Sequence, residues 1–196
     1  MATEQQSVDL VDGDVVRSFA RAALLAVLIG ASAPVAIPIG PAPITLQVLF
    51  VFLAGLVLGP LWGSFSMVLY LTAGAVGVPV FAGMESGFGV LVGETAGYLW
   101  SYPIAAGLIG LFVHRGTELR DPAEQSLAVV VVALLAGLIV IYGMGVGHMM
   151  WLLHLDLWEA LLTGMVFFLP GDFLKLVAAI LIVKSGQLAV GTHESR

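Results

Sequence analysis

Asp172 and Lys175 are two opposite charges inside a stretch that otherwise holds apolar residues, one glycine and one proline. This stretch, FFLPGDFLKLVAAILIV at residues 167–183, is long enough to cross a lipid bilayer. A charged side chain at the bilayer centre costs about 2.5–3.5 kcal/mol on insertion scales, so such residues usually mark functional sites. Three positions apart on a helix, the two side chains share a side and can pair. They either build a polar binding site or form an ion pair that stabilises helix packing.

The two residues before this pair favour the binding site. Pro170 removes a backbone donor and kinks or starts a helix, and Gly171 follows it directly. Broken backbone at membrane depth is tolerated only against protein or a wet cavity. Together the kink, the freed carbonyls and the paired charges predict a polar pocket.

The composition indicates an all-α polytopic membrane protein. The 196 residues are 60% hydrophobic and 10% charged, whereas about a quarter of a soluble domain is charged. A net charge of −6 argues against nucleic-acid binding. The chain has no cysteine, and therefore no disulfide, cysteine-ligated metal or thiol nucleophile. We expect no cofactor.

Six apolar segments predict six transmembrane helices in a membrane domain over residues 17–190, preceded by an acidic cytoplasmic tail over residues 1–16. Gly59 and Pro60 separate the second segment from the third. The predicted spans are Ala20–Ile37, Ile44–Leu58, Leu61–Val78, Thr95–Val113, Leu127–Val146 and Leu157–Val183.

The placement of lysine and arginine predicts the orientation. With six spans, six of the seven basic residues fall on one side: Arg17, Arg21, Arg115, Arg120, Lys184 and Arg196. The positive-inside rule then puts both termini in the cytoplasm of a multi-pass protein of the cell membrane. One rival interpretation takes the first span, with Ala31–Ala33 at its end, as a cleaved signal peptide. Its removal would leave five spans and break the charge pattern.

The outer loops supply further candidate binding residues. PIGPAPITLQ, residues 38–47, contains three prolines and predicts a stiff, shaped turn that brings Thr45 and Gln47 to the start of the second span. Residues 78–95 are rich in glycine and apolar side chains, which predicts a lid folded back over the protein rather than an ordinary connector. Glu94, Thr95 and Tyr98 follow at the start of the fourth span.

Two other patterns concern surfaces. HMMWLLHLDLWE, residues 148–159, predicts an interfacial segment with Trp151 and Trp158 as belt anchors. Its two histidines are six positions apart and do not share a helix face, so we expect no metal site. In the first span, Ala22, Ala26 and Gly30 recur every four residues, a spacing that lets another helix pack closely in lipid. That helix belongs either to a partner or to the chain itself.

Four stretches resemble the BioY family, the biotin-binding S components of energy-coupling-factor (ECF) transporters. In family order they are PITLQ with AGLVLGP (residues 43–60), LYLTAGAVGVPVFAG (69–83), GETAGYL (93–99) and FLPGDFLK (168–175).

The resemblance implies six membrane helices and a biotin pocket near the outer face, covered by the loops after the first and third spans. It implies that Asp172 and Lys175 contact the ligand, and that Ala22 and Ala26 face a transmembrane coupling subunit driven by two cytoplasmic ATPases. It also implies that captured biotin is delivered inward through that module. The chain has no Walker A motif, so ATP hydrolysis belongs to the partners and the chain is not an enzyme.

Biotin suits the candidate residues. A carboxylate can accept a ureido N–H, and Lys175 can donate to the ureido oxygen or offset the anionic tail. Phe81, Tyr98 and Trp151 are available to wall the thioether ring. The chain departs from the family at Glu94 and Ala96, where GPTGGYL is common. Family members also commonly use an arginine near the ligand, but this chain has none between Arg21 and Arg115. Thr95, Tyr98, Lys175 or loop backbone could replace that contact, while Glu94 either faces solvent or accepts a ureido N–H.

Three alternatives stay open. The same architecture could bind a different vitamin. Asp172 and Lys175 could instead form the relay of a proton-coupled secondary transporter. An intramembrane protease would need a nucleophile and a base at membrane depth; Ser64, Ser66 and Ser86 are present, but the histidines lie at loops or helix ends.

Overall fold

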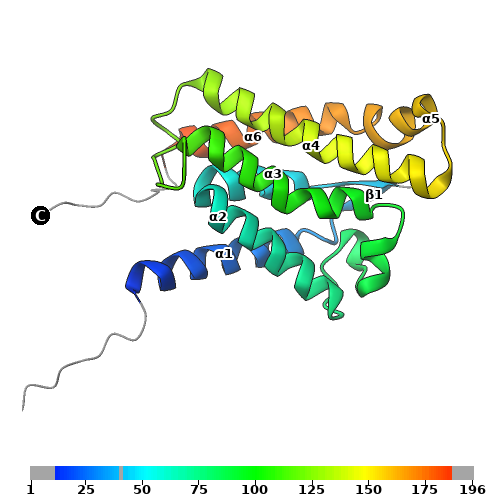
Figure 1. Ribbon diagram of the computed structural model, residues 1–196, viewed down its shortest axis with the longest axis horizontal. Helices are drawn as coiled ribbons and strands as arrows, with labels where there is room; N and C mark the ends of the chain where they lie inside the picture. Colours follow the sequence, from blue (N-terminus) through cyan, green and yellow to red (C-terminus); the bar gives the residue numbers. More distant parts are fainter. Residues whose placement is uncertain (1–11, 40–41, 187–196) are drawn as a thin grey trace, which may run out of the picture.

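The computed structural model describes residues 12–39 and 42–186, which form helices and a single two-stranded hairpin (Figure 1). In chain order the elements are α1 (Gly13–Ala31), β1 (Ala36–Ile39), β2 (Ala42–Thr45), α2 (Gln47–Ala75), η1 (Ala82–Met84), η2 (Phe88–Val92), α3 (Ala96–His114), α4 (Leu127–Leu153), α5 (Leu157–Leu161), η3 (Leu162–Val166) and α6 (Leu169–Lys184). The predicted helical class is confirmed. The first helix begins at Gly13, and Asp12 caps it by accepting a hydrogen bond from the backbone N–H of Asp14.

Three helices of the described chain are long and apolar enough to cross a membrane: α2, α3 and α4. A fourth candidate is the pair made by residues 157–166 and α6, which meet at a bend of 42°. The bend lies just before Pro170, as the sequence predicted, and Pro170 occupies the first turn of α6, where its missing N–H has no intrahelical partner to lose. α1 is not in this group, and its first turns carry Asp14, Arg17 and Arg21.

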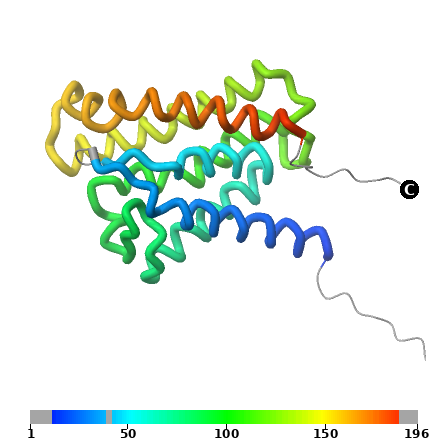
Figure 2. The backbone as a smooth tube through the Cα atoms, turned by 180° about the vertical axis from the view of Figure 1, so that it is seen from behind, coloured from blue at the N-terminus to red at the C-terminus, as the bar shows by residue number. Residues whose placement is uncertain are grey.

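α2 is two helical halves joined at a reversal. Gly59 has φ 73° and ψ −173°, which is not helical, and a positive φ favours glycine. A Cβ built on Gly63 would lie 2.8 Å from the carbonyl oxygen of Ala54, so residues on opposite sides of the break are neighbours. The two halves run in opposite directions in both views (Figures 1 and 2). They coincide with the segments predicted as the second and third spans.

A buried histidine satisfies a carbonyl that this reversal leaves open. In a regular helix the N–H of residue 60 would bond to the carbonyl of Leu56, but Pro60 has no N–H. The Nε2 atom of His114 lies 3.0 Å from that oxygen. The backbone N–H of Arg120 donates to Nδ1 of the same ring at 2.9 Å, so the proton is on Nε2 and donates to Leu56. The end of α3 is thereby tied to the turn in α2.

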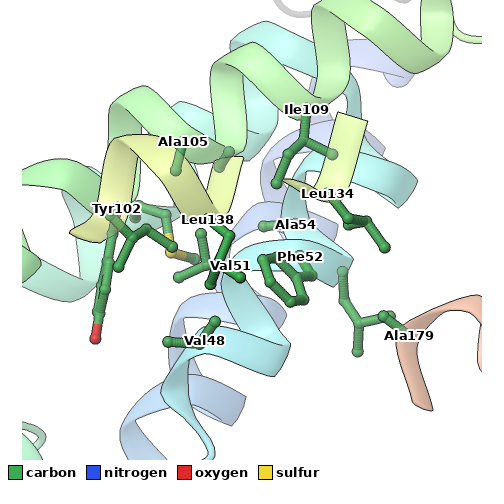
Figure 3. Packing of buried hydrophobic residues seen from close by; sticks show 14 of the residues in the cluster. Val48, Val51, Phe52, Ala54, Tyr102, Ala105, Ile109, Leu134, Leu138 and Ala179 are labelled. Carbon is green, nitrogen blue, oxygen red and sulfur yellow. The ribbon is translucent and has the colours of Figure 1, made fainter. Parts of the chain in front are cut away.

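Apolar side chains from four helices meet in one core (Figure 3). Val51, Phe52 and Ala54 come from α2, and Ile109 from α3 is fully buried among them. α4 contributes Leu134 and Leu138, and α6 contributes Ala179. Alanine and glycine at these contacts let the helices approach closely, which favours helix association in lipid. This core fixes the positions of α2, α3, α4 and α6 around the site described below.

Pro38 and Pro43 of the first outer loop lie in a hairpin, which the sequence did not predict. Ala36 pairs with Thr45, and Pro38 lies opposite Pro43 in the antiparallel register. Because the two prolines share one level of the ladder, the missing N–H donors are confined to that level. The hairpin delivers Thr45 and Gln47 to the start of α2, as expected.

The two ends of the molecule differ in composition. The starts of α1 and α4, the ends of α3 and α6 and the reversal of α2 lie at one end, here called the basic end (Figures 1 and 2). It carries Arg17, Arg115, Arg120 and Lys184. The hairpin, residues 76–95 and the α4–α5 connection lie at the opposite end, here called the lid end (Figures 1 and 2).

Candidate ligand-binding site

A cavity of about 700 Å³ lies between α2, α3, α4 and α6, and the hairpin and the segment after α2 also line it. Its volume is within the range of small-ligand sites, roughly 300–1,000 Å³. It brings together residues that are far apart in the sequence. The predicted binding residues that line it are Thr45, Gln47, Phe81, Glu94, Thr95, Tyr98, Asp172 and Lys175.

Asp172 and Lys175 form a buried ion pair in the cavity wall. Nζ of Lys175 lies 2.5 Å from Oδ1 of Asp172, and the two side chains are 10% and 4% exposed. Both belong to the first turns of α6, where the positive end of the helix dipole stabilises a carboxylate. Removing one member of such a pair leaves an uncompensated buried charge, at a cost of about 3–5 kcal/mol.

Tyr142 is a part of the site that the sequence analysis missed. Its hydroxyl donates to Oδ2 of Asp172 at 2.5 Å, so each carboxylate oxygen has one donor from the protein. An ionised carboxylate has about four acceptor positions, so Asp172 can accept further hydrogen bonds from a ligand. The sequence did contain a signal for it: Tyr142 lies within the apolar residues 127–147, and the hydroxyl of a buried tyrosine usually forms a hydrogen bond.

Aromatic rings build the wall on the α3 and α4 side. Tyr98 and Tyr142 meet edge to face, with ring centroids 6.4 Å apart. The hydroxyl of Tyr98 donates to the carbonyl oxygen of Gly164 at 2.6 Å, which ties α3 to the π-helical turn η3. Tyr102 lines the same wall. These rings offer flat apolar surface beside the charged pair, which suits a compact ring system with a polar edge.

Gln47 is the centre of a buried hydrogen-bond network. Its Nε2 atom donates to the hydroxyl of Tyr70 at 2.8 Å and to the carbonyl oxygen of Val80 at 3.5 Å. Its Oε1 atom accepts from the hydroxyl of Tyr102 at 3.4 Å. The side chain therefore links both halves of α2, α3 and the segment after α2.

Residues 78–95, here called the lid, fold back over the cavity, as predicted. Phe81 is 1% exposed and packs on Tyr70 with ring centroids 5.6 Å apart. A Cβ on Gly74 would lie 2.1 Å from the Phe81 ring, so only glycine at this position leaves room for the ring. The backbone N–H of Gly83 donates to Ala33, just past α1, and that of Gly87 donates to Gly74 in α2.

Trp151 does not belong to the cavity, which corrects the prediction that it walls a ligand. It is 72% exposed, and its ring meets that of His148 with centroids 5.8 Å apart. Trp151 follows Tyr142 by nine positions on α4, half a turn out of phase, so it points away from the cavity that Tyr142 faces. Its exposure fits the other role predicted for it, an interfacial anchor together with Trp158.

The small residues of α1 divide between two environments. Ala22 is fully buried, and its carbonyl oxygen accepts a hydrogen bond from Ser66 in α2, so it packs within the chain. Ala26 and Gly30 line a second, mostly apolar groove of about 530 Å³ between α1 and the second half of α2. The side chain of Val80 from the lid lies over Gly30.

No three histidine, cysteine, aspartate or glutamate residues among the described residues lie close enough together to hold a metal ion. His148 has another contact: its Nε2 atom lies 3.0 Å from the carbonyl oxygen of Gly93 at the end of the lid.

Comparison with known proteins gives consistent similarities. The model of the BioY family matches residues 2–192. The biotin transporter BioY of Thermotoga maritima is 39% identical over 166 residues, which cover 85% of this chain and 93% of that protein. The probable biotin transporter BioY of Bacillus subtilis is 37% identical over 166 residues, with 84% and 86% covered. The crystal structure of the S-component for biotin from an ECF-type ABC transporter matches with a TM-score of 0.82 and 27% identity, over 93% of this chain and 96% of that one.

Proposed function

The chain belongs to the BioY family, and from this premise we propose that it is the biotin-binding subunit of a vitamin uptake transporter. The observation that carries the proposal is the buried Asp172–Lys175 pair in the wall of a small-ligand cavity at the lid end. The relatives named above support biotin as the ligand, because they are named as biotin transporters and their similarity extends over most of this chain.

The proposed pose uses the charged pair for the ureido group of biotin. Asp172 accepts a ureido N–H, and Lys175 donates to the ureido oxygen. Charge-assisted hydrogen bonds are roughly twice as strong as neutral ones. Phe81 and Tyr98, which line the cavity, pack against the bicyclic ring. Thr45, Gln47 and Thr95 supply neutral polar contacts around it.

We further propose six membrane crossings. They are α1, the two halves of α2, α3, α4, and the bent unit of α5, η3 and α6. Support comes from the reversal at Gly59 and from the opposite ends reached by successive segments (Figure 2). The arginines of the basic end support the proposal that this end is cytoplasmic, by the positive-inside rule, and that the lid end lies outside the cell membrane.

Delivery into the cell is proposed to need a transmembrane coupling subunit and two ATPase subunits. The described part of α1 presents Leu24 and Val27, which are 58% and 65% exposed, beside the groove that contains Ala26 and Gly30. Close packing of a partner helix on small residues is the usual mode of association in lipid. Ala22 is less suited to this surface because it is buried within the chain.

Binding to the purified protein tests the ligand assignment. The protein is expressed in a biotin-containing medium, purified in detergent, and any co-purifying vitamin is identified by mass spectrometry. Isothermal titration with biotin and with a panel of other vitamins then ranks the ligands. We expect biotin to co-purify and to bind most tightly. Tighter binding of another vitamin would contradict the assignment while leaving the transporter architecture in place.

A further inference from the structure

The loops at the lid end contain no lysine or arginine, although biotin, the proposed ligand, carries a negative charge. The sequence contains no lysine or arginine between Arg21 and Arg115, and none between Arg120 and Lys175. Every loop at the lid end falls within these intervals. Among the described residues that line the cavity, Lys175 is therefore the only lysine or arginine.

That cation is already engaged deep in the wall, while the other charges at the cavity are negative. Lys175 lies 2.5 Å from Asp172, and both residues are buried. Glu85 and Glu94 line the same cavity but are exposed, which places them at its mouth. His148 contacts the carbonyl oxygen of Gly93, next to Glu94.

This arrangement discriminates between the two parts of a biotin-like ligand. The ureido ring is uncharged and needs the donor and acceptor of the buried pair. With the ring at that pair, the side chain of the ligand extends toward the mouth. Two unit charges 4 Å apart interact by about 1 kcal/mol in bulk water and by several times more near a protein surface, and salt screens the effect. A carboxylate at the tail is therefore repelled by Glu85 and Glu94, whereas an amide is not.

We propose that Glu85 and Glu94 are specificity-determining residues that favour ureido-ring ligands with a neutral or cationic tail over the free acid. The ligand class is biotin whose carboxyl group is joined as an amide, either to ammonia or to an amine that carries positive charge. The bias is strongest at low ionic strength and disappears at high ionic strength. This inference rests on the proposed function of the cavity and specifies its substrate class.

The test compares biotin with its primary amide, which has the same length and ring. Dissociation constants are measured by isothermal titration at pH 8 in an uncharged detergent, at ionic strengths of about 0.01 M and about 1 M, where the Debye length is about 30 Å and about 3 Å. In the wild-type protein we expect the amide to bind about threefold to tenfold more tightly at low salt, and the ratio to approach one at high salt.

Substitutions assign the effect to the two glutamates. In the double variant Glu85→Gln/Glu94→Gln we expect the low-salt ratio to fall close to one. The matched control, Glu118→Gln/Glu124→Gln, removes the same charge from exposed residues between α3 and α4 at the basic end, and we expect it to keep the wild-type ratio.

Three results would overturn the inference. In the first, biotin binds at low salt as tightly as its amide, or more tightly, which would mean that its carboxylate reaches Lys175. In the second, the ratio persists in the Glu85→Gln/Glu94→Gln variant. In the third, that variant loses affinity for both compounds equally, so that the glutamates contact the ring and not the tail. Failure of the wild-type protein to bind either compound would contradict the proposed function itself, and is thereby distinguished from the other three.

Discussion

Asp172 is the residue on which the proposed recognition of biotin depends, because its contacts hold the carboxylate in place without using all of its acceptor capacity. Lys175 and Tyr142 each donate to one of its oxygens. A ligand N–H can then bind a carboxylate whose position is fixed before the ligand arrives. Such preorganisation reduces the entropy lost on binding.

Removing either charge of the pair should abolish tight biotin binding. We expect Asp172→Asn and Lys175→Ala each to weaken binding by about 100-fold or more, because each leaves a buried partner uncompensated and removes a ligand contact. Isothermal titration in detergent measures the loss. Leu174→Ala, at a 72% exposed position between them on α6, is the matched control and should keep its affinity.

A charge-free double variant separates binding from folding. Asp172→Asn/Lys175→Met removes both charges, which is often neutral for stability. It should therefore elute as a folded membrane protein and still not bind biotin. Unchanged affinity in this variant and in both single variants would refute the assignment of the pocket.

Tyr142 should act through Asp172 as a positioning residue. We expect Tyr142→Phe to weaken biotin binding by about tenfold, the value of one hydrogen bond to a charged group. In the Asp172→Asn background the same change should have a much smaller effect, because the carboxylate that Tyr142 positions is gone. Equal losses in both backgrounds would instead indicate that Tyr142 contacts the ligand directly.

At the scale of elements, the reversal of α2 illustrates what can be inferred from the sequence. Gly59 and Pro60 punctuate an apolar run, and this local signal predicted the boundary correctly. The partner of the open carbonyl, His114, lies 58 residues away in the chain, so no local pattern indicated it. The hairpin over residues 36–45 was also missed, because its strands are short and proline-containing, and their pairing depends on the register of the two segments.

Substitution of Gly59 tests the importance of this reversal. Gly59→Ala should destabilise the protein by about 1–3 kcal/mol, because the residue has a positive φ and a Cβ would lie 2.7 Å from Leu119. Thermal unfolding in detergent measures the change. Gly143→Ala, at a helical position in α4 with no atom within 4 Å of the added Cβ, should be neutral or slightly stabilising. Equal stability of both variants would contradict the conformational role of Gly59.

A substitution in the groove between α1 and the second half of α2, here called the α1 groove, separates docking of a partner from binding of biotin. Ala26→Leu should leave biotin affinity unchanged but reduce uptake strongly, because a larger side chain blocks close approach of a partner helix. Uptake of radiolabelled biotin by cells that also express the coupling module measures the effect. Ala128→Leu, at an exposed position of α4, is the control. Normal uptake with Ala26→Leu would place the docking surface elsewhere.

The whole molecule has the cavity toward one end, whereas Arg17, Arg115, Arg120 and Lys184 lie at the other. The described basic residues that were predicted to be cytoplasmic are Arg17, Arg21, Arg115, Arg120 and Lys184. The sixth, Arg196, and residues 1–11 of the predicted tail lie outside the described residues. The predicted residues from loops and helix starts, except Trp151, do line the cavity. Sequence reasoning failed for Tyr142, whose importance comes from a contact with Asp172, 30 positions away.

Transport by the chain alone distinguishes two classes of mechanism. Reconstituted into liposomes without other subunits, the protein should bind biotin but not accumulate it under a pH gradient, because the proposed mechanism depends on ATP hydrolysis by partners. Filtration of vesicles after incubation with external radiolabelled biotin measures accumulation, and Asp172→Asn provides the background level. Accumulation driven by the pH gradient and lost in that variant would support a proton-coupled transporter instead.

Met84 of the lid lines both the ligand cavity and the α1 groove. A ligand in the cavity and a partner helix in the groove would therefore both contact Met84, and a shift of this residue would couple the two binding events. Thermodynamic linkage is reciprocal: if a docked partner lowers the affinity for vitamin by some factor, bound vitamin lowers the affinity for that partner by the same factor. The protein with bound vitamin and the protein without it would then differ in their affinity for the docked partner.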